Sequence, residues 1–299
     1  MKAFADWATS RRFRLWLLVI LFLPLLVFML PVAPALLALH ALRNGPAEGL
    51  LGVFVTIGIV AAIGVLTGAP MSQAWILTGL LTLYLLPAGV GGALLSSTRS
   101  FSVAYQGTIL GTMLAVFVLF AAFPAALQLG EMIGEAWMAM LSDGAFTSEQ
   151  LQALAEVPPE GFVSLMLAPP FAVALVGLIA GFWLFAQIRE GINFGSHFRS
   201  LRLGRFATIV LILAVTVCQL VPYVPLQLMA PLALVGFLFQ GLAVLHARVR
   251  NENWPITVPI VVYALLCFPL TTVAVVLGLS AVGLLDNFFA LRGRAAADD

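Results

Sequence analysis

Long apolar runs separated by short polar joints make up most of the chain. The runs are Leu15–Leu42, Gly49–Thr67, Ala74–Leu95, Val103–Ala126, Phe162–Ile188, Phe206–Val221, Leu226–Leu245 and Pro255–Leu285. They show no sustained alternation of apolar and polar positions, so they predict helices and not strands. A membrane core about 30 Å thick requires about 20 apolar residues in helical form. The pattern therefore predicts an all-α, polytopic helical membrane bundle, with residues 1–299 forming a single membrane domain.

The first and last runs are too long for one comfortable span each. Pro31 and Pro34 interrupt Leu15–Leu42, and Pro269 interrupts Pro255–Leu285. Proline removes a backbone donor and restricts the preceding residue, so each run is predicted to turn there and form a hairpin. Each helix of the first hairpin then has about 14 residues and measures about 21 Å, so it crosses only part of the membrane. The alternative is one long helix in each run.

The distribution of charge favours the hairpins. With both present, all 14 lysines and arginines fall on one side of the membrane, which the positive-inside rule identifies as the cytoplasm. About eight to ten transmembrane or half-spanning helices are expected, ten with the hairpins and eight without, and both termini are cytoplasmic. The Leu127–Gly161 stretch contains acidic residues but no lysine or arginine, so it is predicted to be an extracytoplasmic loop (127–161). Within it, Ser148–Leu154 reads as a short amphipathic helix.

The segment Arg189–Arg205 is a polar island between two apolar runs. Phe194, Phe198 and Leu201 recur in it at helical spacing, beside a basic face. This pattern is typical of an amphipathic helix at the level of the cytoplasmic head groups. The alternative is a loop whose arginines only fix the orientation. The residues expected to contact lipid or a protein partner are Arg189, Arg199, Arg202 and Arg205.

Composition supports the membrane assignment and excludes other classes. The chain is 62% hydrophobic and 9% charged, and its mean hydropathy is +1.10. A soluble domain has about 25% charged residues. A net charge of +1, with basic residues scattered at helix ends, gives no indication of nucleic-acid binding. Cys218 and Cys267 both lie in apolar runs, where they are expected to pack as small hydrophobic residues. The small residues Ala33-Pro34-Ala35 resemble a signal-peptide cleavage site, but the apolar run continues past them, which favours a retained segment.

Three Gly-x-x-x-Gly pairs lie within the predicted spans. This spacing lets helix backbones approach closely, and packing within the chain is favoured over a dimer interface. The glycines are Gly64 with Gly68, Gly107 with Gly111, and Gly177 with Gly181.

Polar residues inside a membrane protein are costly, and they mark candidate binding positions. The candidates for ligand binding are Arg43, Glu48, Gln106, Gln240 and His246. Arg43 and Glu48 are close enough in sequence to pair with each other or to bind something polar.

No motif in the chain carries catalytic chemistry. H-E-x-x-H, G-x-S-x-G and Walker A sequences are absent, no paired aspartates lie within the apolar runs, and the histidines are too far apart in sequence for a recognisable metal site. The chain is therefore expected not to be an enzyme and to need no cofactor or metal. Its partners are expected to be membrane lipids and, as a second kind, a membrane protein.

Three segments, Phe194–Arg205, Phe239–His246 and Gly283–Arg292, resemble hallmark stretches of the YybS-like family of bacterial membrane proteins, whose domain has no known function. That family is remotely similar to the substrate-binding S components of energy-coupling-factor (ECF) transporters. The resemblance implies a bacterial inner-membrane location and a helical core that binds a small molecule. S components dock their partner through an Ala-x-x-x-Ala surface, and Ala33, Ala35, Ala38 and Ala41 depart from this spacing.

Two functions remain open from the sequence. The first is S-component-like binding or transport of a small, apolar or amphipathic molecule. The alternative is an envelope assembly or scaffold protein that acts through helix–helix contacts and the basic cytoplasmic segment 189–205.

Overall fold

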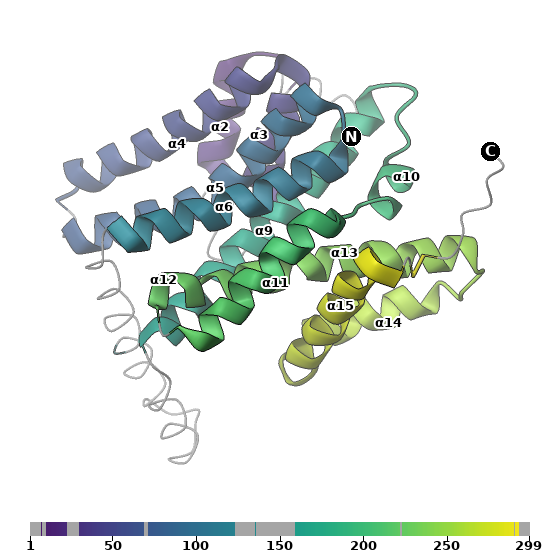
Figure 1. Cartoon of the computed structure of the whole chain (residues 1–299). Helices are drawn as coiled ribbons and strands as arrows, with labels where there is room; N and C mark the ends of the chain where they lie inside the picture. Colours follow the sequence, from purple (N-terminus) through teal and green to yellow (C-terminus); the bar gives the residue numbers. More distant parts are fainter. Residues whose placement is uncertain are drawn as a thin grey trace.

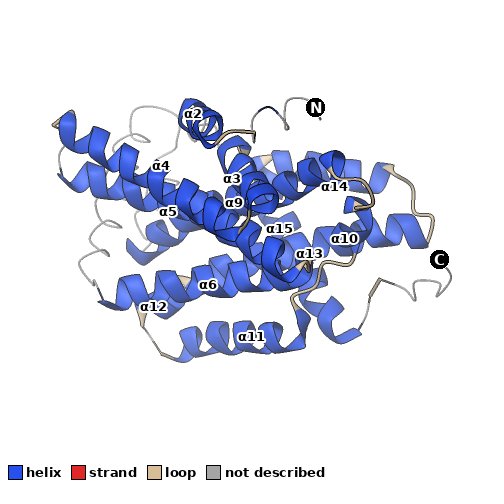
Figure 2. Ribbon diagram, turned by 90° about the horizontal axis from the view of Figure 1, so that it is seen from above, coloured by secondary structure: helices blue, strands red, loops and turns tan. Residues whose placement is uncertain are grey.

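All regular structure in the described part of the chain is helical (Figures 1 and 2). A computed structural model describes residues 7, 10–22, 30–68, 71–122, 135, 159–221, 223–289 and 291–292. The helices are α2 (Arg12–Phe22), α3 (Val32–Asn44), α4 (Pro46–Leu66), α5 (Met71–Thr98), α6 (Phe101–Ala122), α9 (Pro159–Ile188), α10 (Phe194–Arg199), α11 (Gly204–Leu220), α12 (Val224–Gln227), α13 (Met229–Asn251), α14 (Thr257–Cys267) and α15 (Pro269–Phe289).

The surface of the bundle is suited to lipid. Within the described ranges, ten helices have eleven or more residues, and six regions are long and apolar enough to cross a membrane. Large side chains such as Phe54, Leu114 and Leu270 are exposed by 63%, 63% and 98%. A monomeric soluble protein rarely exposes so large an apolar surface to water. The prediction of an all-α, polytopic membrane bundle is confirmed.

The first apolar run folds back on itself. Helix α2 ends at Phe22 and α3 begins at Val32. Arg12, at the start of α2, forms an ion pair with Glu48, which lies just beyond the end of α3. The start of α2 and the end of α3 therefore lie at the same end of the bundle, as a hairpin requires. Pro34 lies in the first turn of α3 and not in the turn between the two helices. A proline is tolerated there because the first turn of a helix loses no helical hydrogen bond.

The last apolar run also turns, at Phe268. Helix α14 ends one residue earlier, and Pro269 opens α15. The Thr271 hydroxyl donates to the Leu265 carbonyl oxygen at 2.6 Å, and the Thr272 hydroxyl donates to the Leu266 carbonyl oxygen at 2.9 Å. These two bonds satisfy carbonyls that the end of a helix leaves without a partner.

Helix α15 runs parallel to α13, so the α14–α15 pair starts and ends at the same end of the bundle. The Ser280 hydroxyl donates to the Leu234 carbonyl oxygen at 2.9 Å. Near the other end of both helices, Asn251 donates through Nδ2 to the Arg292 carbonyl oxygen at 3.2 Å. The alternative with a single long helix in each terminal run is wrong, because both runs are broken.

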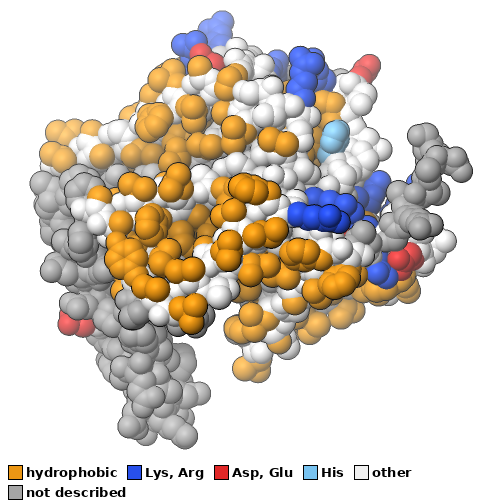
Figure 3. All heavy atoms as spheres, viewed as in Figure 1, with side chains coloured by type: hydrophobic (Ala, Val, Ile, Leu, Met, Phe, Trp, Pro, Cys, Tyr) orange, Lys and Arg blue, Asp and Glu red, His pale blue; other side chains and the backbone are white. Residues whose placement is uncertain are grey.

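The arginines of the described residues gather at one end of the bundle, which we call the basic end. Figure 3 shows arginine side chains at the top and to the right of the centre of the visible face, and hydrophobic side chains over its centre and left. The arginines at helix ends and joints on this side are Arg11, Arg12, Arg14, Arg43, Arg99, Arg189, Arg199, Arg202, Arg205, Arg248, Arg250 and Arg292.

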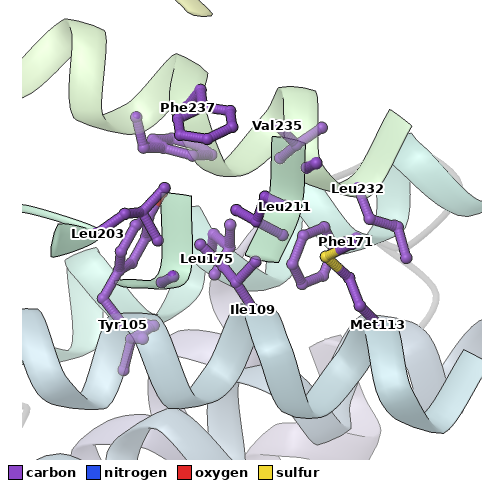
Figure 4. Packing of buried hydrophobic residues seen from close by; sticks show 14 of the residues in the cluster. Tyr105, Ile109, Met113, Phe171, Leu175, Leu203, Leu211, Leu232, Val235 and Phe237 are labelled. Atoms are coloured by element: carbon purple, nitrogen blue, oxygen red, sulfur yellow. The ribbon is translucent and has the colours of Figure 1, made fainter. Parts of the chain in front are cut away.

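Helices α6, α9 and α13 form the main hydrophobic core, together with the joint before α11 (Figure 4). Ile109, Leu175 and Leu232 are fully buried there. Tyr105 is also fully buried, and its hydroxyl donates to the Gly236 carbonyl oxygen at 2.7 Å. This bond satisfies a polar group that would be costly in an apolar interior.

The Gly177/Gly181 pair lies where α9 meets α3. A Cβ atom at Gly177 would lie 2.3 Å from the Pro34 Cβ, and one at Gly181 would lie 2.7 Å from the Ala35 carbonyl oxygen. Ala38 lies between this contact and α5, where a Cβ atom at Gly92 would lie 2.9 Å from the Ala38 Cα. The alanine face of α3 is therefore covered by the chain's own helices.

The other Gly-x-x-x-Gly pairs make fewer contacts. A Cβ atom at Gly107 would meet the Leu94 side chain at 2.7 Å, whereas one at Gly68 or Gly111 would have none of the described residues within 4 Å. Gly64 lies in the last turn of α4, where its carbonyl oxygen accepts a bond from the Thr67 hydroxyl at 3.1 Å.

The basic segment is not one amphipathic helix. Only Phe194–Arg199 is helical, as α10, and Asn193 caps it by accepting from the Ser196 backbone N–H at 3.1 Å. Gly191 and Gly204, which lie on either side of α10, have φ values of 86° and 73°, a backbone region that favours glycine. The segment therefore combines a short helix with a joint at residues 200–203 that is not part of a helix.

The acidic stretch 127–161, with its expected helix Ser148–Leu154, lies outside the described residues except for Glu135 and Pro159–Gly161. Helix α9 begins at Pro159, three residues before the apolar run that predicted it.

Candidate functional site: a buried carboxylate at the basic end

Asp286, near the end of α15, is the centre of a buried polar network. It is 1% exposed. Its Oδ2 atom lies 2.9 Å from both Nε and Nη2 of Arg292, and it accepts from Gln240 Nε2 at 3.1 Å. Arg202 approaches the same oxygen from the surface, with its Nε at 3.7 Å. The charge of the carboxylate is therefore balanced within the protein, as a buried charge requires.

Close contact between α13 and α15 brings this network together. A Cβ atom at Gly283 would lie 2.1 Å from the Phe237 carbonyl oxygen, and one at Gly241 would lie 2.0 Å from the Leu279 carbonyl oxygen. Only glycine permits this approach at both positions. Gln240 and Asp286 lie beside these two glycines, so the contact places their side chains within hydrogen-bonding distance.

Arg292 connects the carboxylate to the joint at residues 200–203. It lies beyond the end of α15 and is 5% exposed. Its guanidinium donates to the backbone carbonyl oxygens of Arg199 and Leu201. Burial lowers the pKa of Arg292, and the negative charge of Asp286 acts in the opposite direction. An arginine in a protein keeps its proton, so this is a paired buried cation.

Polar side chains from two further helices hold the joint. Gln106 on α6 donates to the Arg202 carbonyl oxygen at 2.9 Å, and Gln240 on α13 accepts from the Leu203 backbone N–H at 2.9 Å. Ser102 Oγ accepts from the Arg202 backbone N–H at 3.2 Å. These bonds satisfy backbone groups that no helix pairs, and they fix the start of α11.

The structure thus brings together five of the residues that the sequence singles out, namely Gln106, Gln240, Arg199, Arg202 and Arg205. Arg205 donates through Nε to the Asn287 carbonyl oxygen at 3.4 Å. The two glutamines thus have a structural role here: both bond to the backbone of the joint, and Gln240 also bonds to the Asp286 carboxylate.

His246 and Arg189 lie next to aromatic rings near this network. His246 Nε2 lies 2.8 Å from the Tyr263 hydroxyl oxygen, and its ring packs edge-on against Phe198 at 5.7 Å between centroids. The Arg189 guanidinium stacks over Phe185 at 5.8 Å. Rings and cations at one level are typical of a membrane interface.

Glu48 belongs to a separate polar cluster at the first hairpin. It pairs with Arg12 from α2, and its Oε2 lies 3.7 Å from Nε2 of His40 on α3. The expected pairing of Glu48 with Arg43 stays a prediction.

Arg292 and Asn287 are residues that pattern reasoning missed. Both follow a long apolar run, where a charged or amide side chain reads as an interfacial residue. The available signal was the spacing of Asp286 and Arg292, which lets a chain reversal after α15 bring opposite charges together.

Two surface hollows are candidates for ligand binding. One, of about 580 Å³, lies at the basic end between the end of α9 and the start of α10, and Trp183, Gln187 and Asn193 are among its lining residues. The other, of about 420 Å³, is an apolar groove between α11, α13 and α15. Its lining residues are Leu211, Ile212, Val215, Thr216, Ala230, Pro231, Ala233, Leu234, Phe237 and Leu284.

Within the described residues, no group of three or more His, Cys, Asp or Glu side chains is placed to hold a metal ion. Comparisons with protein-family models, with curated proteins and with solved structures gave no match to this chain.

Proposed function

We propose that this chain is a multi-pass protein of the bacterial inner membrane that binds an amphipathic small molecule with an anionic head group. The groove between α11, α13 and α15 is the binding site, and Arg205 binds the head group. The resemblance to the YybS-like family, and through it to transporter S components, supports both the location and a role in binding or transport.

The observation that carries this proposal is the alignment of Arg205 with the apolar groove. Arg205, Ile212 and Thr216 are separated by seven and four residues along α11, so they share one face of the helix. Ile212 and Thr216 line the groove. Leu284 lines it from α15, one turn before Asn287, whose carbonyl oxygen accepts the bond from Arg205. The cation therefore lies at the basic end of the groove.

The dimensions of this arrangement suit a lipid-like chain. The distance along α11 from Arg205 to Thr216 is about 16 Å at 1.5 Å per residue. This is about half the thickness of a hydrocarbon core of about 30 Å. A head group at Arg205 thus allows an acyl chain to lie in the groove and reach the membrane midplane. Each buried CH₂ group contributes about 0.8 kcal/mol, and a basic residue near an anionic lipid contributes about 1 kcal/mol.

Replacing Arg205 by glutamine is expected to weaken binding of a phosphatidylglycerol probe about fivefold, because about 1 kcal/mol of charge attraction is lost. Native mass spectrometry of the detergent-purified protein, titrated with phosphatidylglycerol and with phosphatidylcholine, measures this. The matched control is Arg250→Gln, which removes an exposed arginine at the same end but far from the groove. Equal affinity of the two variants for phosphatidylglycerol would contradict the assignment of Arg205.

Replacing Thr216 by tryptophan is expected to abolish retention of both lipids, because the indole ring fills the groove. Val217→Trp is the control, since Val217 is the next residue, is 39% exposed and does not line the groove. If the two variants retain lipid equally, the groove is not the binding site. If the loss of bound lipid has no effect on the protein, and a second membrane protein is stably crosslinked to it, the scaffold alternative is favoured.

The proposed orientation places the basic end and both termini in the cytoplasm. Cysteine introduced at Ser200, in a chain with Cys218→Ala and Cys267→Ala, is expected to react with a membrane-impermeant maleimide only after the membrane is opened. Ser200 is exposed, and its hydroxyl bonds only locally, to the His197 carbonyl oxygen at 2.9 Å. Labelling from the periplasm in intact cells would reverse the orientation.

A further inference from the structure

Around the first hairpin and the start of α4, three buried polar atoms lack a hydrogen-bond partner among the described residues, namely Trp16 Nε1, His40 Nε2 and Glu48 Oε2. They come from three helices, α2, α3 and α4. A buried polar atom without a partner costs about 1–3 kcal/mol, so three in one region are unusual for a folded protein. Their clustering indicates that something polar belongs between them.

The neighbouring bonds determine what each atom offers. Asn44 Nδ2, which can only donate, lies 2.8 Å from His40 Nδ1. Nδ1 therefore accepts, and the neutral ring carries its proton on Nε2. Arg12 occupies Oε1 of Glu48, which leaves Oε2 as an acceptor. The indole nitrogen of Trp16 is a donor only. The site thus offers two donors and one acceptor.

The distances place His40 beside Glu48, and Trp16 beside the next turn of the helix that carries Glu48. His40 Nε2 and Glu48 Oε2 are 3.7 Å apart, beyond a direct hydrogen bond but within reach of an oxygen placed beside both. Trp16 Nε1 lies 3.7 Å from the position of a Cβ atom at Gly52, one turn after Glu48 on the same helix. The Leu37 Cδ2 atom would lie 2.9 Å from the same Cβ position, so the Leu37 side chain borders the site on this side.

We propose that Trp16, His40 and Glu48 form a binding site for one hydroxyl group, carried by a water molecule or by a small polyol. A hydroxyl accepts two hydrogen bonds and donates one, which complements the two N–H donors and the carboxylate oxygen. His40 is 1% exposed, so the site is enclosed on the side of the bundle. The Arg12 side chain, 61% exposed, separates it from solvent at the basic end and lies on the path of entry. This site is independent of the groove at Arg205.

The indole N–H of Trp16 reports on this site directly. In protein labelled with ¹⁵N-tryptophan, its NMR peak is identified by its loss in Trp16→Phe. We expect the peak to shift in both His40→Phe and Glu48→Gln, because each change removes a group that orients the shared hydroxyl. Glu252→Gln, which alters another arginine-paired carboxylate, directly after the end of α13, is expected to leave the peak in place.

A glycerol titration separates the two sources of the hydroxyl. A saturable shift of the Trp16 peak identifies a polyol site, whereas no shift together with a cross-peak to water identifies a bound water molecule. A Trp16 peak whose position is unchanged in both His40→Phe and Glu48→Gln would overturn the proposal. So would a peak with neither a glycerol response nor a water cross-peak.

Discussion

Replacing Asp286 by asparagine is expected to lower the free energy of unfolding by about 3–5 kcal/mol, because one partner of a buried ion pair is removed while the other stays buried. Asparagine preserves the shape of the side chain but loses the charge that Arg292 faces through two nitrogens at 2.9 Å. Arg292 is 5% exposed and cannot regain hydration without leaving the joint. Reversible denaturation in detergent micelles measures the loss.

The control for this change is Glu252→Gln. Glu252 pairs with Arg248 at 2.9 Å, but both side chains are about a third exposed. An ion pair of this kind contributes less than about 1 kcal/mol. If Asp286→Asn and Glu252→Gln cost the same, the buried network does not hold the basic end together. A double variant, Asp286→Leu with Arg292→Met, is expected to recover part of the stability, since it removes both buried charges.

The two hairpins were predictable because two independent patterns in the sequence agree. Prolines break the first and last apolar runs, and the positive-inside rule places all basic residues on one side only when both runs turn back. The described arginines do lie at one end of the bundle. The position of the first turn was less predictable, because Pro34 suits the first turn of a helix as well as a break between helices.

The contacts of the candidate site were only partly predictable. Gln106 and Gln240 attract attention because amide side chains in apolar runs are costly. Both bond to backbone groups of the joint at residues 200–203, about 100 and 40 residues away along the chain, and Gln240 also donates to Asp286. Sequence pattern does not encode such distant pairings. Glu48 shows the same difficulty, since its partner Arg12 precedes it by 36 residues.

The apolar groove was not predictable at all. In a chain that is 62% hydrophobic, residues that line a groove, face lipid or fill the core are of the same types. Ile212 and Val217 illustrate this, because only the packing of α13 and α15 around α11 separates the first from the second. The helix-period amphipathicity that locates a buried face in a soluble protein is weak when lipid covers the outside.

Replacing Gly283 by alanine is expected to destabilise the protein by about 1–3 kcal/mol or more, since the added methyl group overpacks a tight helix contact. The new Cβ atom would lie 2.1 Å from the Phe237 carbonyl oxygen and 2.8 Å from the Gly241 nitrogen. Backbone atoms cannot rotate away, so α13 and α15 must separate. Their separation also pulls Gln240 from Asp286 and exposes the buried network. Unfolding in detergent micelles, monitored by circular dichroism, measures the change.

Gly278→Ala provides the matched control, because it makes the same substitution on the same helix at a position where no atom of the described part of the chain lies within 4 Å of the new Cβ. Alanine favours a helix over glycine by about 1 kcal/mol, so this variant is expected to be neutral or slightly stabilised. The two alanine variants should therefore move in opposite directions. Equal stability of both would mean that α13 and α15 do not meet at these glycines. The placement of Gln240 beside Asp286, which depends on that contact, would then be wrong as well.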